Sequence, residues 1–206
     1  MAEQRVAVNP GVVDWSGENP GIYLRDVDDG PWVTLGVFFR VVMSPYGSGH
    51  AMLVLDEPET GKGWPDVRNF IVNDNEELTR YLIRDYVSGF PSFRDKPGLE
   101  AMSYVPLDTV ACAGDPQTEY TETVTAGDLS ARMTWSDTME PMAVEVTPKT
   151  SATGKHDMYS LFFEAKQAKI EVNGDRLSGN VSTRQFFGKT MSTAFLAFSE
   201  TWVQPA

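Results

Sequence analysis

The chain has 206 residues, of which 41% are hydrophobic and 22% are charged. This composition is typical of a folded globular protein, and the length is sufficient for a sizeable core. Seventeen Lys and Arg residues against 29 Asp and Glu residues give a formal net charge of −12. Such a charge repels nucleic-acid phosphates and anionic lipid surfaces, so we expect neither nucleic acid nor a membrane as a partner.

The sequence also lacks the signals of membrane insertion and secretion. Its longest apolar stretch, residues 33–39, is far shorter than the roughly 20 residues that span a bilayer. The first residues contain no apolar secretory segment. Cys112 is the single cysteine, so an intrachain disulfide and a thiolate zinc cluster are both excluded. We therefore expect a soluble protein of the cytoplasm.

In chain order, residues 1–30 are predicted to form an extended arm. Pro10-Gly11 and Pro20-Gly21 are turn dipeptides, and an acidic loop occupies residues 26–30. Trp15 and Tyr23 indicate that the arm packs on the rest of the molecule. No repeat, low-complexity tract or linker divides the remainder of the chain, so residues 31–206 are predicted to form one domain.

The first part of this domain contains strand patterns and one helix pattern. Residues 32–43 are dense in Val and Phe, as in a strand covered on both faces, and residues 51–55 and 68–72 are shorter strand candidates. A helix is predicted near 75–88. Its apolar residues recur at helical spacing, Asp74 or Asn73 can cap it, and two glutamates occupy its first turn. Gly89 and Pro91 favour its end.

The second half is dominated by strand and turn patterns. Residues 129–135 and 142–146 alternate between apolar and polar side chains. Asn173-Gly174 favours a tight hairpin, because both residues tolerate a positive φ. Residues 126–128 resemble another hairpin tip, and residues 191–203 are apolar on both faces, as in a central strand or one that closes a barrel.

About ten strands and one short helix, without regular alternation of the two, predict a mainly β protein. The pattern fits a mainly antiparallel barrel or sandwich, and we expect an antiparallel β-barrel, because closure removes the exposed edges of a sheet with so many strands. A barrel rich in aromatic residues (11 Phe, 7 Tyr and 5 Trp) fits a cavity for an organic ligand.

The candidate catalytic residues begin with the only two histidines, His50 and His156. His50 follows a glycine-flanked loop, and His156 precedes Asp157, which can orient its ring as a general base. Both also fit ordinary loop positions exposed to water. Neither has a second ligand at helical spacing, and no nucleotide-binding motif is present. We therefore predict no metal and no cofactor.

Charged residues provide the other candidates. Arg84 and Tyr86, at the end of the predicted helix, are candidates for substrate binding, although Arg84 also fits a solvated ion network. Arg132 and Glu145 lie on alternating strands. If they point into a barrel, a charge there demands a ligand or partner, so Arg132 becomes a substrate-binding candidate and Glu145 a catalytic one. If they point outward, they are ordinary surface charges.

The segment from Asp74-Asn75-Glu76 to Phe90-Pro91 resembles the acetoacetate decarboxylase family. The resemblance implies a β-rich barrel, with Arg84 at a polar position of the family motif. Four positions depart from that motif. Ile83 and Asp85 replace Gly and Glu, and Ser92 and Phe93 stand where the lysines of the family would lie. Without that amine no carbonyl is captured as an iminium, so decarboxylation is not implied. Lipocalin-like (calycin) barrels are an equally good structural analogy.

Three functions remain open. The first is a cofactor-independent acid–base enzyme, of the lyase, hydratase or isomerase type, that acts on a small, mainly hydrophobic molecule in a barrel cavity. The alternative is a non-catalytic, lipocalin-like protein that binds an apolar small molecule. The third is an interaction protein with a filled barrel, whose surface pairs with itself, as a homodimer or other homo-oligomer, or with another partner.

Overall fold

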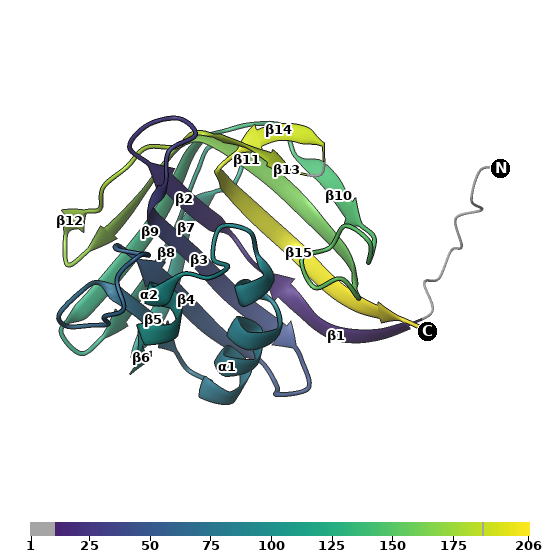
Figure 1. The fold of residues 1–206 in the computed structure, drawn as a ribbon, viewed down its shortest axis with the longest axis horizontal. Helices are drawn as coiled ribbons and strands as arrows, with labels where there is room; N and C mark the ends of the chain where they lie inside the picture. The colour runs from purple at the N-terminus through teal and green to yellow at the C-terminus, as the bar shows by residue number, and fades with distance from the viewer. Residues whose placement is uncertain (1–10, 187) are drawn as a thin grey trace.

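A computed structural model describes residues 11–186 and 188–206, and it confirms a mainly β fold (Figure 1). Thirteen strands form one large sheet, and β13 and β14 form a separate two-stranded ribbon. The strands are β1 (Gly11–Glu18), β2 (Gly21–Arg25), β3 (Trp32–Met43), β4 (Gly49–Leu55), β5 (Asn69–Asn73), β6 (Ser103–Pro106), β7 (Thr109–Asp115), β8 (Glu119–Ala126), β9 (Leu129–Thr138), β10 (Met142–Val146), β11 (Asp157–Val172), β12 (Asp175–Arg176), β13 (Thr183–Phe186), β14 (Lys189–Ser192) and β15 (Ala194–Pro205).

The predicted helix near 75–88 is present as α1 (Glu76–Asp85), followed by a 3-10 turn, η1 (Val87–Gly89). Asn75 caps it by accepting a hydrogen bond from the Leu78 N–H at 3.1 Å. Asp74, one of the two expected caps, instead accepts a hydrogen bond from the His50 backbone N–H of β4 at 2.6 Å. A second short helix, α2 (Pro97–Ala101), has no counterpart in the sequence prediction.

The main path of the large sheet runs β6-β5-β4-β3-β1-β15-β11-β9-β8-β7, and β2 pairs with both β3 and β15. The expected antiparallel pairing does not hold at β5 and β6, which are parallel, so the large sheet is mixed. The chain between them passes through α1, η1 and α2, and a crossover of that length allows it to return in the same direction. After β6, the Leu107 N–H donates to Asn73 of β5, and the next N–H, of Asp108, donates to Thr125 of β8.

Both faces of the sheet bury apolar residues. The inner core lies between β3–β5 and β7–β9, which Figure 1 shows as front and back walls, and it includes Phe38, Met52, Met133 and Trp135. The outer core lies on the opposite face of β3–β5, where Figure 1 shows α1 and α2 in front of the strands. Burial on both faces confirms the prediction for residues 32–43.

The predicted arm contributes two strands to the sheet itself. Residues 11–18 form β1, which pairs with β15 and β3, and residues 21–25 form β2. Trp15 and Tyr23 are buried in the outer core, as their size suggested. Residues 1–10 of the arm lie outside the described residues. Within the described part of the chain, no helix has the length and apolar character needed to cross a bilayer.

Candidate functional site

A cavity of about 530 Å³ lies on the outer-core side of the sheet, beside β2 and β15. The inner face of the sheet, where the sequence predicted a ligand, is filled by its own apolar side chains. The cavity is bounded by β2, β15, the loop at residues 90–92, the loop at residues 150–152 and the β13–β14 ribbon. Its aromatic side chains are those of Tyr23, Trp32, Phe90, Phe162, Phe186, Phe195 and Trp202.

An irregularity in β15 directs an acidic side chain into this cavity. Ser199 has a φ of 52°, and the pairing of β11 with β15 shifts register beside it. Before the shift, Phe195 contributes to the outer core and Leu196 to the inner core. The extra residue reverses the alternation, as a β-bulge does. Glu200 consequently points to the same face as Phe195 and lines the cavity.

Glu200 is only 2% exposed and has two hydrogen-bond donors. The Asn19 side-chain amide donates to Oε1 at 3.1 Å, and the Trp202 indole N–H donates to the same oxygen at 2.7 Å. Burial raises the pKa of Glu200 to about 7, and the two hydrogen bonds oppose this rise only in part. Near neutral pH the group therefore exists in both protonated and ionised forms.

Tyr23 lines the cavity and is close enough to Arg184 and Glu200 for both to affect its pKa. Its ring makes edge contacts with Trp32 and Phe195, at centroid distances of 5.8 and 5.6 Å. Burial raises the pKa of Tyr23 to about 12, with Arg184 acting to lower it and Glu200 to raise it. The phenol is therefore a neutral hydrogen-bond donor across the physiological pH range.

Arg25 and Arg184 form a cationic end. The Arg184 guanidinium lies over the rings of Tyr23, Phe186 and Phe195, with Cζ at 5.0, 4.8 and 5.0 Å from their centroids. Burial lowers the pKa of Arg184, and the like charge of Arg25 lowers it further. Arg25 itself lies 3.7 Å over the Trp32 ring. Its ion-pair partner, Asp29, is 3.8 Å away and fully exposed.

Three polar atoms of cavity-lining residues are enclosed without a hydrogen-bond partner among the described residues. They are Oδ1 of Asn19, Nε of Arg25 and Nε of Arg184. Buried polar groups are rarely left unpaired, because their desolvation is uncompensated. The three residues therefore bear an uncompensated burial cost beside the cavity.

Two of the predicted site residues lie together, behind the cavity wall. His156 is fully buried, with Nε2 at 2.6 Å from the Asp14 carboxylate and Nδ1 at 2.8 Å from the Thr153 hydroxyl. Its ring stacks on Tyr86, and both rings contact Trp202, which lines the cavity. Neither His156 nor Tyr86 lines the cavity itself.

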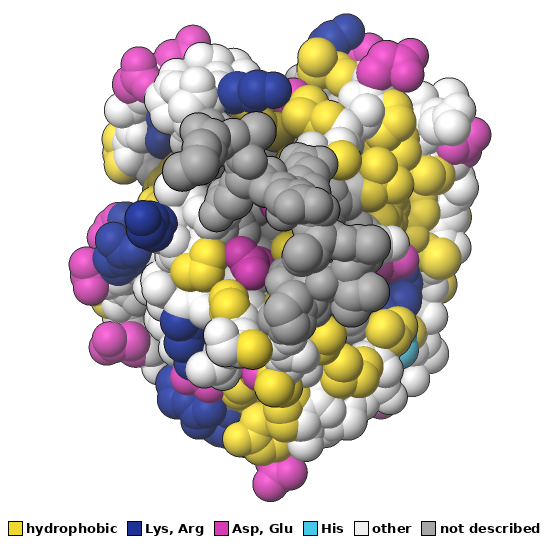
Figure 2. Space-filling model, turned by 90° about the vertical axis from the view of Figure 1, so that its right-hand side faces the viewer, with side chains coloured by type: hydrophobic (Ala, Val, Ile, Leu, Met, Phe, Trp, Pro, Cys, Tyr) yellow, Lys and Arg dark blue, Asp and Glu magenta, His cyan; other side chains and the backbone are white. Residues whose placement is uncertain are grey.

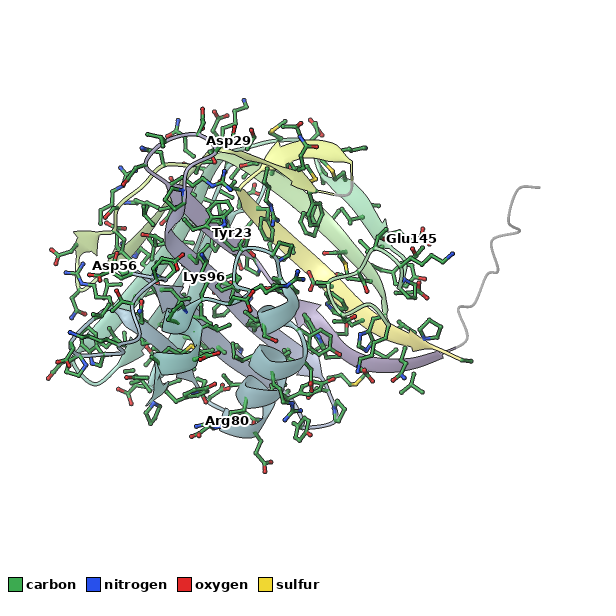
Figure 3. The ribbon with its side chains drawn as sticks, viewed as in Figure 1. Tyr23, Asp29, Asp56, Arg80, Lys96 and Glu145 are labelled. Atoms are coloured by element: carbon green, nitrogen blue, oxygen red, sulfur yellow. The ribbon has the colours of Figure 1, made fainter. Side chains whose placement is uncertain are left out.

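The other four predicted residues lie away from the cavity and from one another. His50 on β4 pairs with Asp74 at 2.8 Å, and Arg84 on α1 is an exposed partner of Asp85. Arg132 on β9 and Glu145 on β10 are exposed. Figure 3 shows Glu145 near the outer edge of the molecule, apart from Tyr23. No described group of three or more His, Cys, Asp or Glu side chains could hold a metal ion.

The residues that the sequence analysis missed are Asn19, Arg25, Arg184 and Glu200. One signal existed for Glu200, since a carboxylate within the apolar pattern of residues 191–203 is unusual for a central strand. No protein-family model, curated protein or solved structure matches the chain. The resemblances to acetoacetate decarboxylases and to calycin barrels therefore remain predictions.

Proposed function

We propose that the protein is a cofactor-independent acid–base enzyme, of the lyase, hydratase or isomerase type, that acts on a small organic molecule in this cavity. One observation carries the proposal. A buried carboxylate, Glu200, with a pKa of about 7 lines an aromatic cavity of about 530 Å³. Ligand sites commonly have this size and combine an apolar lining with a few polar groups.

The chemistry depends on two groups. An ionised Glu200 removes a proton from a carbon next to a carbonyl, and the electron pair of that bond moves to the carbonyl oxygen. The neutral Tyr23 phenol, which also lines the cavity, donates a hydrogen bond to this oxyanion. Return of the proton from Glu200 to another carbon completes an isomerisation. If the carbon next to the deprotonated one carries a leaving group, its expulsion forms a double bond and gives a lyase reaction. Addition of water to such a double bond is the reverse of this elimination and gives a hydration.

The proposal includes a barrel-like wall behind the cavity. Successive residues Leu107 and Asp108 donate hydrogen bonds to β5 and β8, the two sides that meet at β6 and β7. This arrangement supports a sheet that closes on itself, so that the cavity rests on a wall held at both edges. A rigid wall keeps Glu200 and Tyr23 in fixed relative positions.

The test measures proton transfer directly. The protein is incubated in D₂O with a panel of aryl-substituted ketones, keto acids and enones, and deuterium incorporation is followed by NMR. We expect exchange that rises with the ionisation of Glu200 around pH 7 and is lost in Glu200→Gln. The exposed Glu140→Gln is the matched control and should retain the exchange. Equal exchange in wild type and Glu200→Gln would refute the catalytic role of this carboxylate.

The aromatic lining also favours the second candidate, a protein that binds a small molecule without chemistry. In that case Glu200→Gln would still bind the compounds that wild type binds, and neither protein would catalyse exchange. Calorimetric binding measured beside the exchange experiment separates the two functions.

A further inference from the structure

We propose that the ligand of this cavity is a flat aromatic or conjugated carboxylate, with its anionic group held by Arg184 and Arg25 and a hydroxyl or N–H group at the Asn19–Glu200 end. The inference rests on the proposed function only in taking this cavity as the substrate site. It adds the chemical class of the substrate and its direction in the cavity.

The two arginines of the cavity favour a ligand with a carboxylate. Arg184 and Arg25 both line the cavity, and among the described residues Arg184 has neither an ion-pair partner nor a hydrogen bond from its enclosed Nε. Arg25 has the same unpaired Nε, while its acidic partner Asp29 lies in water. Two neighbouring guanidinium groups repel each other, so a bound anion relieves that repulsion as well as the cost of their burial. A planar guanidinium pairs with a carboxylate through two parallel hydrogen bonds.

Asn19 and Glu200 favour a hydrogen-bond donor on another part of the ligand. Asn19, a residue only 4% exposed, holds the Glu200 carboxyl in place through its amide nitrogen. Both described hydrogen bonds to Glu200 go to Oε1, so a ligand hydroxyl or N–H can donate to its other oxygen, Oε2. The two ends of the cavity therefore require opposite hydrogen-bonding groups, which fixes the orientation of the ligand.

The walls select a flat body. Phe162 stacks on Phe186 and on Phe195, with centroid distances of 5.6 and 5.1 Å, and Phe90 stacks on Trp202 at 6.3 Å. Aromatic faces of this kind pack best against another planar group. The molecule as a whole carries a net charge of −12, so its long-range field does not attract an anion. The affinity must come from the local arginines.

The experiment is titration calorimetry at pH 7 with 4-hydroxycinnamate, its uncharged methyl ester, and cinnamate, which lacks the hydroxyl. We expect wild type to bind 4-hydroxycinnamate about 10- to 100-fold more tightly than the ester, as a charged hydrogen bond predicts. Cinnamate should bind more weakly than 4-hydroxycinnamate by a smaller factor. This comparison uses wild type alone, so it does not depend on the folding of any variant.

Two arginine variants then test whether Arg184 binds the carboxylate. Arg184→Met keeps the length and apolar stem of the side chain and should lose most of the preference for the acid over the ester. The exposed Arg176→Met is the matched control and should keep it. The inference is overturned if wild type binds none of the three compounds, if the ester binds as well as the acid, or if a folded Arg184→Met retains the preference.

Failure of the proposed enzyme function gives a different result. If wild type and Glu200→Gln both prefer the acid to the ester while neither catalyses deuterium exchange, the carboxylate site stands and the catalytic role of Glu200 does not. If exchange occurs without a preference for the acid, the enzyme function stands and the ligand class is wrong.

Discussion

Glu200 links the cavity to the stability of the folded protein. A glutamate ionises near 4.5 when exposed and near 7 in this site, so between these values the folded state binds more protons than the unfolded state. The contribution of this group to the free energy of unfolding is therefore largest below pH 4.5. This contribution, about 3 kcal/mol in total, is lost as the pH rises from 4.5 through 7.

Glu200→Gln should remove this decrease in stability with rising pH. The Gln carbonyl can still accept the hydrogen bonds from Asn19 and Trp202, but it does not ionise. We expect the difference in unfolding free energy between variant and wild type to move in favour of the variant from pH 5 to pH 8. Urea denaturation at each pH measures this difference, and the other titrating groups cancel in it. A difference that stays constant with pH would contradict the assignment.

At the scale of elements, the bulge in β15 decides which side chains reach the cavity. Ser199 adopts the left-handed conformation, which β-branched residues tolerate poorly. We expect Ser199→Val to lower the free energy of unfolding by about 1–2 kcal/mol, whereas Ser199→Gly should be neutral or slightly stabilising. Thermal and urea unfolding of the two variants provide the comparison. Equal stability of both would mean that this backbone conformation is not required.

Elements with a strong local pattern were predictable. The helix near 75–88 follows from its apolar spacing and its acidic first turn, and Asn173-Gly174 forms the predicted turn, with φ values of 52° and 87°. The alternation in residues 129–135 is present as buried apolar and exposed polar positions at the start of β9. In each case the information lies within a few neighbouring residues.

The site was not predictable in this way, because its residues come together only through long-range pairing. Glu200 reaches the cavity through a bulge, and a strict alternation assigns it to the same face as Leu196. Arg184 lies on a short ribbon outside the main sheet. His156, in contrast, was prominent in the sequence for its rarity, yet the structure uses both ring nitrogens in contacts behind the cavity wall.

At the scale of the whole molecule, a buried ion pair joins the two walls of the sheet. Arg40 on β3 donates two hydrogen bonds to Glu122 on β8, with both contacts at 2.9 Å, and it also contacts Glu18 on β1. Glu122 is fully buried. The Tyr120 hydroxyl also donates to Glu122, at 2.8 Å, but only the guanidinium offsets the burial of this carboxylate with an opposite charge.

Arg40→Met should therefore lower the free energy of unfolding by about 3–5 kcal/mol, since it leaves Glu122 buried without an opposite charge. The double variant Arg40→Met/Glu122→Gln should recover part of this loss. Arg84→Met, at an exposed ion pair, is the control and should change stability by less than about 1 kcal/mol. Urea denaturation of the three variants measures these values. A loss in Arg40→Met no larger than in Arg84→Met would show that the buried pair contributes no more to stability than an exposed pair does.

On the face seen in Figure 2, apolar side chains gather towards the right and the bottom of the view, and charged side chains lie mainly around the rim. The exposed apolar residues of the described chain include Val12 and Val13 on β1, Val42 and Met43 on β3, and Leu161 on β11.

The central position of β15, between β1 and β11, has a consequence for how the protein matures. The cavity needs Asn19 and Tyr23 from one end of the sequence and Glu200 and Trp202 from the other. Such distant pairings form slowly and leave strand edges uncovered in the meantime. A tight-binding compound recognises only the finished arrangement, so by mass action it should raise the yield of native protein during refolding.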